Sequence, residues 1–254
     1  MISFIVPAYN EELELPATLA ALHFAARESG QPYEIVVVDD DSSDATAEIA
    51  RGLGARVVPV RCRQIAAVRN AGARSAQGDI FCFVDADTRI SPTHVVEAVA
   101  ALRAGAAGGG ARVRIDDEIP RWARVSVWIF SKLYFAANLG AGAFLFTSRE
   151  FFERSGGFDE QYFAGEEVYF SQALKKLGKF RLLAEPVATS GRKLRMYSGR
   201  QIFAQTMQII LSGKRAVGSR EKLGVWYDGK RETPSASPAI PPASAEIISG
   251  ISKR

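Results

Sequence analysis

The sequence has few of the side chains that hold transition metals or form disulfide bridges, with only 2 cysteines and 2 histidines in 254 residues. Cys62 and Cys82 do not have CxxC spacing, so we expect two reduced thiols. His23 and His94 fall inside predicted helices, away from the polar clusters of the chain. Neither histidine is therefore expected to bind a metal.

Long apolar runs and a strong charge bias are also missing. No run of 18 uncharged apolar residues occurs, so no membrane-spanning helix is predicted. A strand is predicted from Ile2, so we expect no signal peptide and a cytoplasmic location, with the inner face of the cell membrane as a second possibility. Lys+Arg number 32 and Asp+Glu 28, a net charge of +4. Nucleic-acid binding calls for a clustered basic face, so we expect no nucleic-acid partner.

Apolar strands and amphipathic helices alternate over the first 105 residues. The predicted strands are "ISFIVPAYN", "YEIVVVDD", "RVVPV" and "DIFCFVDAD", and a helical pattern follows each. Ser42, Ser43 and Asp44 are candidate N-caps of the second helix, and Ser91 of the fourth, which Gly105 should end. This alternation predicts an α/β fold with a mostly parallel sheet and right-handed crossovers.

Polar clusters stand at the ends of three predicted strands, in "PAYNEE", "DDDSSD" and "DAD". Parallel sheets bind ligands outside the carboxyl ends of their strands. One carboxylate at a strand end is consistent with an ordinary helix cap, whereas three clusters together favour a ligand site.

Asp85 and Asp87 follow a buried strand with one residue between them. In a continuing strand they would face the same side, and their repulsion would be relieved by a divalent cation. Carboxylate oxygens suit Mg²⁺ or Mn²⁺, which also accept phosphate and water as ligands. The alternative is that Asp87 caps the turn before Ser91 and Asp85 is solvated. The pair alone does not decide between the two interpretations.

Four motifs occur in order: "FIVPAYNEE", "EIVVVDDDSSDAT", "RNAGARSAQGDIFCFVDAD" and "GGFDEQYFAGEEVYFSQALKKLG". Together they resemble the family 2 glycosyltransferases, over roughly residues 2–195. The resemblance implies a GT-A (Rossmann-like) fold with a mostly parallel sheet, flanking helices and a smaller antiparallel and helical part on the acceptor side. It also implies an enzyme that uses a nucleotide-diphosphate sugar and Mn²⁺ or Mg²⁺.

By this resemblance, residues 1–230 form one domain, with a nucleotide-binding part at 1–105 and an acceptor-side part at 106–230. The tail at 231–254 is rich in Pro, Ser and Ala, so we expect it to be disordered.

The resemblance assigns the nucleoside to the ends of the first two strands, at Pro7, Ala8, Tyr9, Glu11, Asp39 and Asp40. Asp39 or Asp40 would accept the N3–H of uracil, so a UDP-linked donor is expected. Asp41 replaces the glycine of the family's "DDGS". Asp44 and Thr46 are expected to shape the start of a helix rather than to contact ligand.

The family's "ARNxG" and "DxD" segments match residues on either side of the fourth strand. Arg69 and Asn70 are implied to lie at the nucleotide, with Arg69 pairing with the diphosphate or orienting the acidic residues. The alternative for Arg69 is an exposed helix charge. Asp87 is implied to bind the metal, with Asp85 and Ala86 beside the ribose or metal-bound water. The metal would offset charge on the departing nucleoside diphosphate.

"GEEVYF" stands where the family usually has "EDxDL". Glu167 is therefore the implied catalytic base, with Glu166 as the second candidate, and a single displacement would invert the anomeric carbon. Tyr169 replaces a further acidic residue. The alternative for the Glu-Glu pair is a solvated helix N-terminus. After the last strand, Arg192 and Lys193 would close over the diphosphate.

Two other functions are open. A sugar nucleotidyltransferase would carry a glycine-rich basic loop after the first strand, but here that loop is the acidic "PAYNEELELP". A non-catalytic module that keeps the fold and binds a nucleotide sugar is not excluded by fold, and Glu167 and Tyr169 are the departures that favour it.

Membrane contact is a further hypothesis. Segments 120–140 and 200–220 combine aromatic or aliphatic residues with flanking cations, which suits interfacial helices and a lipid-linked hydroxyl acceptor. The alternative is that these surfaces pack in the core or form a homodimer.

Overall fold

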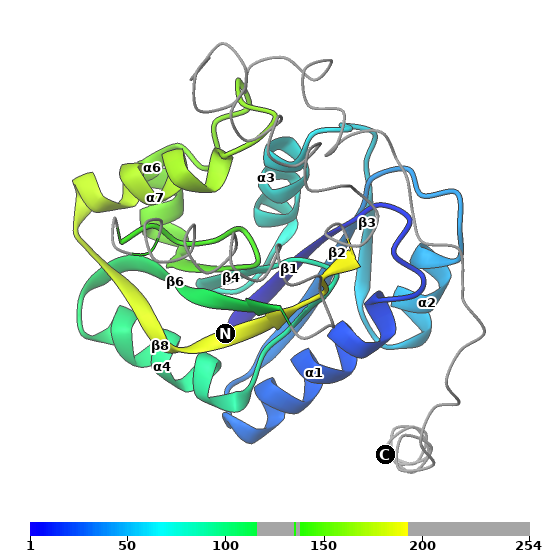
Figure 1. The fold of residues 1–254 in the computed structure, drawn as a ribbon, viewed down its shortest axis with the longest axis horizontal. Helices are drawn as coiled ribbons and strands as arrows, with labels where there is room; N and C mark the ends of the chain where they lie inside the picture. The colour runs from blue at the N-terminus through cyan, green and yellow to red at the C-terminus, as the bar shows by residue number, and fades with distance from the viewer. Residues whose placement is uncertain (116–134, 136–137, 193–254) are drawn as a thin grey trace.

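The computed structural model describes residues 1–115, 135 and 138–192 (Figure 1). Within these ranges, all the strands form one eight-stranded sheet with the order β3-β2-β1-β4-β7-β6-β8-β5. The predicted tail, Lys193, segment 200–220 and most of segment 120–140 lie outside the described residues.

The first half of the chain forms the parallel part of the sheet, as predicted. β1 pairs in parallel with both β2 and β4, and β2 pairs in parallel with β3. The strands of this part are β1 (Ile2–Ala8), β2 (Tyr33–Asp39), β3 (Arg56–Pro59) and β4 (Ile80–Val84). The helices between them are α1 (Leu15–Glu28), α2 (Thr46–Gly52) and α3 (Ile65–Ser75).

Side chains alternate across β1 into two apolar layers, which is why its sequence is almost continuously apolar. Phe4 and Val6 face a core built with α1, α2 and α4 (Pro92–Arg103). Ile5 faces a second core that contains residues of α3, α6 (Arg149–Ser155) and α7 (Glu166–Leu177). Figure 1 shows the two groups of helices on opposite faces of the sheet.

The predicted antiparallel part is present, and its strands extend the same sheet. β7 (Phe144–Ser148) runs antiparallel to its neighbours β4 and β6 (Ala106–Ile115), and β6 pairs in parallel with β8 (Lys179–Thr189). The short β5 (Thr88–Arg89) pairs with the end of β8. Glycines within β6 permit this packing, because a Cβ at Gly109 would lie 2.1 Å from the carbonyl oxygen of Arg181.

The predicted helix boundaries are partly right. α4 has Ser91 as its N-cap and ends just before Gly105, as predicted. The helical pattern after the third predicted strand, "IAAVRNAGARSAQG", predicts a helix that ends at Gly78, and this is wrong because α3 ends at Ser75. The chain is already crossing under β1 at Gly78, whose N–H donates to the Ser3 hydroxyl at 2.8 Å.

Other expectations can be checked in the described ranges. The N-cap of α2 is Ala45 rather than one of the predicted residues, but the Asp44 carboxylate accepts the Thr46 N–H at 3.0 Å and so shapes the helix start. Cys62 and Cys82 are free thiols. Among the described residues, no helix has the length and apolarity needed to cross a membrane.

Candidate active site

The three predicted polar clusters gather at one edge of the sheet, where β1, β2 and β4 end side by side. Ala8 pairs with Asp39 across β1 and β2, and the Asp40 N–H donates to the Ala8 carbonyl at 2.9 Å. The loops that follow are tied together as well, because the Ser43 N–H donates to the Asn10 side chain at 2.8 Å. The edge predicted from the sequence is therefore formed.

The two adjacent aspartates at the end of β2 have different surroundings. One oxygen of Asp40 accepts the backbone N–H groups of Cys62 at 2.7 Å and Arg63 at 3.0 Å. Asp39 is 8% exposed, and its Oδ1 has no hydrogen-bond partner. Asp40 therefore holds the loop after β3, while Asp39 keeps a buried acceptor available.

Arg69 is the largest fully buried side chain among the described residues, at 2% exposure. Its Nη1 donates to Glu166 Oε1 at 2.5 Å, and its Nη2 donates to Asp85 Oδ1 at 2.7 Å. Nη2 also donates to the Gly142 carbonyl, and a Cβ at Gly142 would lie 3.0 Å from this nitrogen. The exposed-charge interpretation of Arg69 is wrong; its guanidinium orients acidic residues from two parts of the chain.

The Asp85-Ala86-Asp87 segment forms a turn. β4 ends at Val84, and the Thr88 N–H donates back to the Asp85 carbonyl at 3.0 Å. The premise of a continuing strand is therefore wrong. Asp87 Oδ1 accepts the Thr189 hydroxyl at 3.2 Å, so each aspartate has a partner of its own. Thr189 was missed by sequence reasoning, because only the pairing of β5 with β8 brings it here.

The two glutamates at the start of α7 also differ. Glu166 is buried against Arg69, while Glu167 is half-buried. Burial, followed by repulsion from Glu166, raises the pKa of Glu167 to about 8. One arginine cation faces several carboxylates here, so the affinity of Glu167 for a proton is raised. Tyr169, two residues further on, stacks on Tyr162 with ring centroids 3.9 Å apart.

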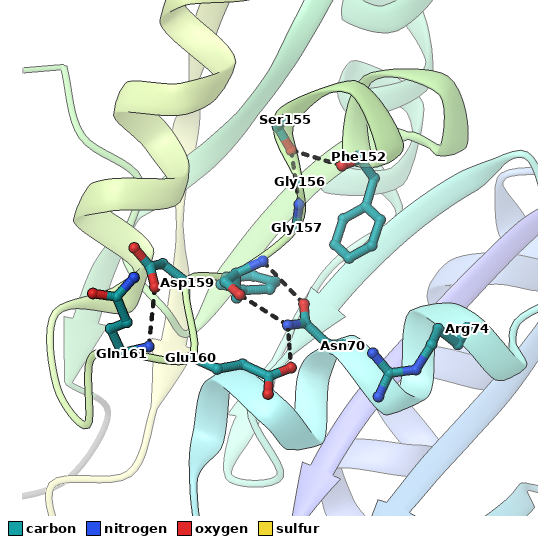
Figure 2. Close-up of a pocket in the computed structure, with 10 residues that line it drawn as sticks. Asn70, Arg74, Phe152, Ser155, Gly156, Gly157, Asp159, Glu160 and Gln161 are labelled. Carbon is teal, nitrogen blue, oxygen red and sulfur yellow. Dashed lines mark hydrogen bonds between the residues drawn. The ribbon is translucent and has the colours of Figure 1, made fainter.

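Asn70 points away from this cluster. Its amide donates to the Phe158 carbonyl at 2.8 Å and Glu160 Oε1 at 2.9 Å, and accepts the Phe158 N–H at 2.9 Å. Gln64 supports the same loop by donating to the Glu160 carbonyl. Figure 2 shows Asn70 directed at this loop, in a pocket of about 510 Å³ that contains none of the carboxylates at the strand ends. The structure therefore gives Asn70 a loop-anchoring position, and its expected place at the nucleotide stays a prediction.

Two other predicted site residues bind each other. Arg192 donates to both oxygens of Glu11, at 2.9 and 2.8 Å, and the two side chains are 8% and 11% exposed. Glu11 and Arg192 are therefore ion-pair partners in this structure, and the expected contacts of Glu11 with the nucleoside and of Arg192 with the diphosphate stay predictions. Lys193 lies outside the described residues.

The chemistry of possible metal ligands is limited to carboxylates. Within residues 1–115 and 138–192, no group of three Asp, Glu, His or Cys side chains is arranged to hold a metal ion. His23 contacts Tyr33 and the Leu53 carbonyl, and His94 contacts Ser91 and the Glu185 carbonyl. His23 therefore connects α1 to β2 and the end of α2, and His94 connects the start of α4 to β8, both away from the candidate site.

Comparison with known proteins identifies the family. Residues 3–158, well over half of the chain, match the family described as glycosyl transferase family 2. The chain belongs to this family.

One curated relative is an undecaprenyl-phosphate 4-deoxy-4-formamido-L-arabinose transferase of Aeromonas hydrophila. It is 34% identical over 113 residues, which cover 41% of this chain and 34% of the relative. Another is a dolichol-phosphate mannosyltransferase of Pyrococcus furiosus, 31% identical over 134 residues, 51% of this chain and 36% of the relative. The chain spans about a third of the length of these relatives.

Solved structures share the GT-A fold with this family 2 chain. A mannosyltransferase of Pyrobaculum calidifontis with GDP-Man and Mn²⁺ has a TM-score of 0.59 at 20% identity, covering 98% of this chain and 79% of that one. Glucosyl-3-phosphoglycerate synthase of Mycobacterium tuberculosis with Mn²⁺ and UDP has a TM-score of 0.58 at 19% identity, covering 87% and 81%.

One departure from the family pattern has a conformational cost. Asp41, which replaces the glycine of "DDGS", has a φ of +63°. Glycine adopts this left-handed region without steric penalty, whereas an aspartate adopts it with some strain. Salt bridges from Arg61 and Arg63 to the Asp41 carboxylate accompany the substitution.

Proposed function

We propose that this family 2 member transfers a sugar from a nucleotide-diphosphate sugar to a hydroxyl acceptor, with inversion at the anomeric carbon. The observation that carries the proposal is the buried Arg69, which joins Asp85 at the end of β4 to the start of α7. This network supports the proposal, because it joins the proposed donor-side carboxylates to the start of α7, where the proposed base lies. We further propose a nucleotide-binding part at 1–105 and an acceptor-side part at 106–230, which the network connects.

The nucleoside would lie along the end of β1, from Pro7 to Tyr9, with its base at Asp39. The unpartnered buried oxygen of Asp39 is suited to accept a ring N–H. Uracil, thymine and guanine carry such a group, whereas adenine and cytosine do not. A UDP-linked donor is consistent with this chemistry, and solved relatives of the fold contain UDP or GDP-Man.

Asp87 and Asp85 would hold the divalent metal, with Ala86 between them. Their oxygens are the hard ligands that Mg²⁺ and Mn²⁺ prefer, so the donor set fits either ion, with phosphate and water as the other ligands. Two solved relatives contain Mn²⁺. The ion would supply positive charge at the departing diphosphate, while Arg69 orients Asp85 and Thr189 orients Asp87.

Glu167 is the proposed base, and Glu166 a positioning residue. Glu166 is already bound to Arg69, so its carboxylate is committed to the network. Glu167 has a pKa of about 8, close to the working pH at which a general base is most effective. It would take the proton from the acceptor hydroxyl as that oxygen attacks the anomeric carbon, and one displacement gives inversion.

The acceptor is proposed to be lipid-linked. The names of the relatives include undecaprenyl-phosphate and dolichol-phosphate transferases, and such acceptors lie at a membrane surface. The neutral Tyr169, where the family usually has another acidic residue, removes a negative charge that would repel a phosphate-bearing acceptor. Peripheral association with the inner face of the membrane, through the segments outside the described residues, is part of this proposal.

Thermal-shift screening tests the proposal. UDP-, GDP- and TDP-sugars are each added with and without Mn²⁺, and the melting temperature is measured. A ligand at 100 times its Kd stabilises the protein by about 2.7 kcal/mol, so we expect the UDP-sugar with Mn²⁺ to give the largest rise. Absence of stabilisation by every nucleotide sugar would overturn the proposed function. Binding without sugar transfer to any lipid-linked hydroxyl acceptor would favour the non-catalytic module.

A further inference from the structure

A cavity of about 510 Å³ lies on the face of the sheet covered by α3 and α6, apart from the carboxylates of the candidate active site (Figure 2). Asn70 and Arg74 of α3, Phe152 and Ser155 of α6, and the loop 156–161 line it. Small-molecule sites occupy about 300 to 1,000 Å³, so the cavity is large enough for a ligand of its own.

The direction of α3 separates this cavity from the active site. α3 connects β3 to β4, and both strands run parallel to β1 and β2, so the helix leads from the carboxyl ends of the strands back toward their amino ends. Arg69 faces the active-site carboxylates, whereas Arg74 lies about 7.5 Å further along the helix axis. Asn70 and Arg74 are four positions apart and therefore share one side of the helix.

Two opposite charges line the cavity without pairing. Glu160 Oε1 accepts the Asn70 amide at 2.9 Å, and Arg74 is an exposed side chain of α3. Among the described residues, the Arg74 guanidinium forms no hydrogen bond or salt bridge. Figure 2 shows this guanidinium directed back along α3 toward Asn70. A guanidinium and a carboxylate on two walls of one cavity, each with free hydrogen-bonding capacity, favour a ligand that bridges them.

The loop between α6 and α7 supplies the other free groups. Asp159 Oδ1 accepts the Gln161 N–H at 3.0 Å. Within the described part of the chain, the second oxygen of Asp159, like that of Glu160, has no partner. Gly157 has a φ of +72°, and a Cβ there would lie 2.8 Å from Asn70 Oδ1. Glycine at this position therefore lets the loop lie against α3 and form a wall of the cavity.

The balance of charge decides the class of ligand. One arginine against two carboxylates, Asp159 and Glu160, disfavours an anion. The hydroxyl groups of a sugar both donate and accept, so one ring can bond to the guanidinium and to both carboxylates. Phe152, which is 9% exposed, offers an aromatic surface for the C–H face of the ring. A neutral saccharide therefore fits the cavity.

We propose that this cavity is a saccharide-binding site, separate from the donor site, for a neutral sugar that is free or at the end of a glycan. The bound ring bridges Arg74 on α3 and Glu160 on the loop that leads into α7, where the proposed base Glu167 lies. The inference goes beyond the proposed function and does not rest on it, because Arg74, Asp159 and Glu160 are not part of the proposed donor site.

Ligand-observed NMR titration of the full chain with the methyl glycosides of glucose, mannose and N-acetylglucosamine tests the proposal. We expect at least one of them to bind with a Kd of about 1 mM, the affinity usual for a ligand of this size. Arg74→Ala should raise this Kd about tenfold, because a charged hydrogen-bond donor is lost, and Glu160→Gln should raise it about threefold or more. Saturating UDP with Mn²⁺ should leave it within about twofold.

Arg154→Ala is the matched control, since Arg154 lies on α6 outside the cavity, pairs with Glu150 and is 51% exposed. This variant should bind the glycoside within about twofold of the parent protein. Arg74→Ala should melt within about 2 °C of the parent protein, because no hydrogen bond or salt bridge of the described residues is lost. Glucose 6-phosphate should bind no more tightly than methyl glucoside.

Five results would overturn the inference. Absence of glycoside binding to the parent protein, or an unchanged Kd in Arg74→Ala, would remove the site. An equal loss in Arg154→Ala would indicate an effect of surface charge alone. Tighter binding of glucose 6-phosphate, strengthened further in Glu160→Gln, would indicate an anion site, and displacement of the glycoside by UDP with Mn²⁺ would assign the sugar to the donor site. The Kd for UDP tests the proposed function separately, so failure of one leaves the other standing.

Discussion

Two pairs of adjacent carboxylates flank the candidate site, one at the end of β2 and one at the start of α7. In each pair one member is committed to the scaffold: Asp40 accepts two backbone N–H groups, and Glu166 pairs with the buried Arg69. The other member is left for ligand. Asp39 has a buried oxygen without a partner, and Glu167 has its pKa raised to about 8.

The difference between the pairs lies in what compensates the charge. At the end of β2, neutral N–H groups of a loop satisfy Asp40. At α7 a single guanidinium pairs with both Glu166 and Asp85, and the pKa of the neighbouring Glu167 is raised. Asp39, the proposed hydrogen-bond acceptor, and Glu167, the proposed proton acceptor, therefore have different surroundings, although each belongs to a pair of neighbouring acids.

The largest expected effect is a loss of sugar-transfer rate when Glu167, the proposed proton acceptor, is substituted. Glu167→Gln should lower the rate of sugar transfer by about 10²- to 10⁴-fold, while nucleotide binding stays within about twofold. The measurement is turnover with a saturating UDP-sugar and a lipid-linked hydroxyl acceptor, with the Kd for UDP measured in parallel. Glu153→Gln, an exposed acid on α6, is the control. Retained turnover in Glu167→Gln would remove Glu167 as the base.

The second largest effect is expected on the free energy of unfolding, when the charge network around Arg69 is broken. Arg69→Met leaves Asp85 and Glu166 without their cation, and loss of one partner of a buried ion pair costs about 3 to 5 kcal/mol. Denaturant unfolding measures the change. In Arg69→Met/Glu166→Gln the loss should be smaller than the sum of the single losses, because the uncompensated buried charge is gone. Strict additivity would contradict the network.

Substitutions of the two aspartates at the end of β2 should affect different quantities, the free energy of unfolding for Asp40 and UDP binding for Asp39. Asp40→Ala should lower the free energy of unfolding by about 1 to 3 kcal/mol, because two N–H groups lose their acceptor. Asp39→Ala should leave stability within about 0.5 kcal/mol and yet weaken UDP binding about tenfold. Chemical unfolding and calorimetry of both variants decide this. Similar stability losses in the two would show that Asp39 is a scaffold residue as well.

The smallest effect expected is a change in how stability depends on pH. The pKa of Glu167 is about 8 in the folded protein, above the ordinary glutamate value of 4.5. The folded state therefore binds more protons than the unfolded one between these values, and the stability due to Glu167 is lost as pH rises through 8. The melting temperature of Glu167→Gln minus that of the parent protein should therefore be higher at pH 9 than at pH 5, by about 3 °C or more. A constant difference would indicate that Glu167 is ionised throughout.

The fold was predictable where the apolar pattern was strong. The unbroken run of β2 predicts a strand buried on both faces, and Ile35–Asp39 are buried. The Ser91 cap and the Gly105 stop correctly bound α4. These signals are local, because burial and capping depend on residues a few positions apart. The end of α3 was missed because the contact of Gly78 with Ser3 is not local in sequence.

The site was predictable by residue type and less so by orientation. Arg69 and Asn70 are consecutive in a motif, but consecutive residues of a helix point about 100° apart. Arg69 therefore faces the carboxylates, while Asn70 faces the Phe158–Glu160 loop. The choice between Asp39 and Asp40 required the position of the loop at Cys62. Thr189 and Gly142 belong to no motif and join the site only through folding.

The ion pair between Glu11 and Arg192 joins positions 181 residues apart. The loop at Glu11 is synthesised before β2 and every later strand, and domains begin to fold during synthesis. Arg192 emerges only after every described strand has been made. The ion pair that fixes the loop after β1 therefore forms only once the strands of the described sheet have left the ribosome.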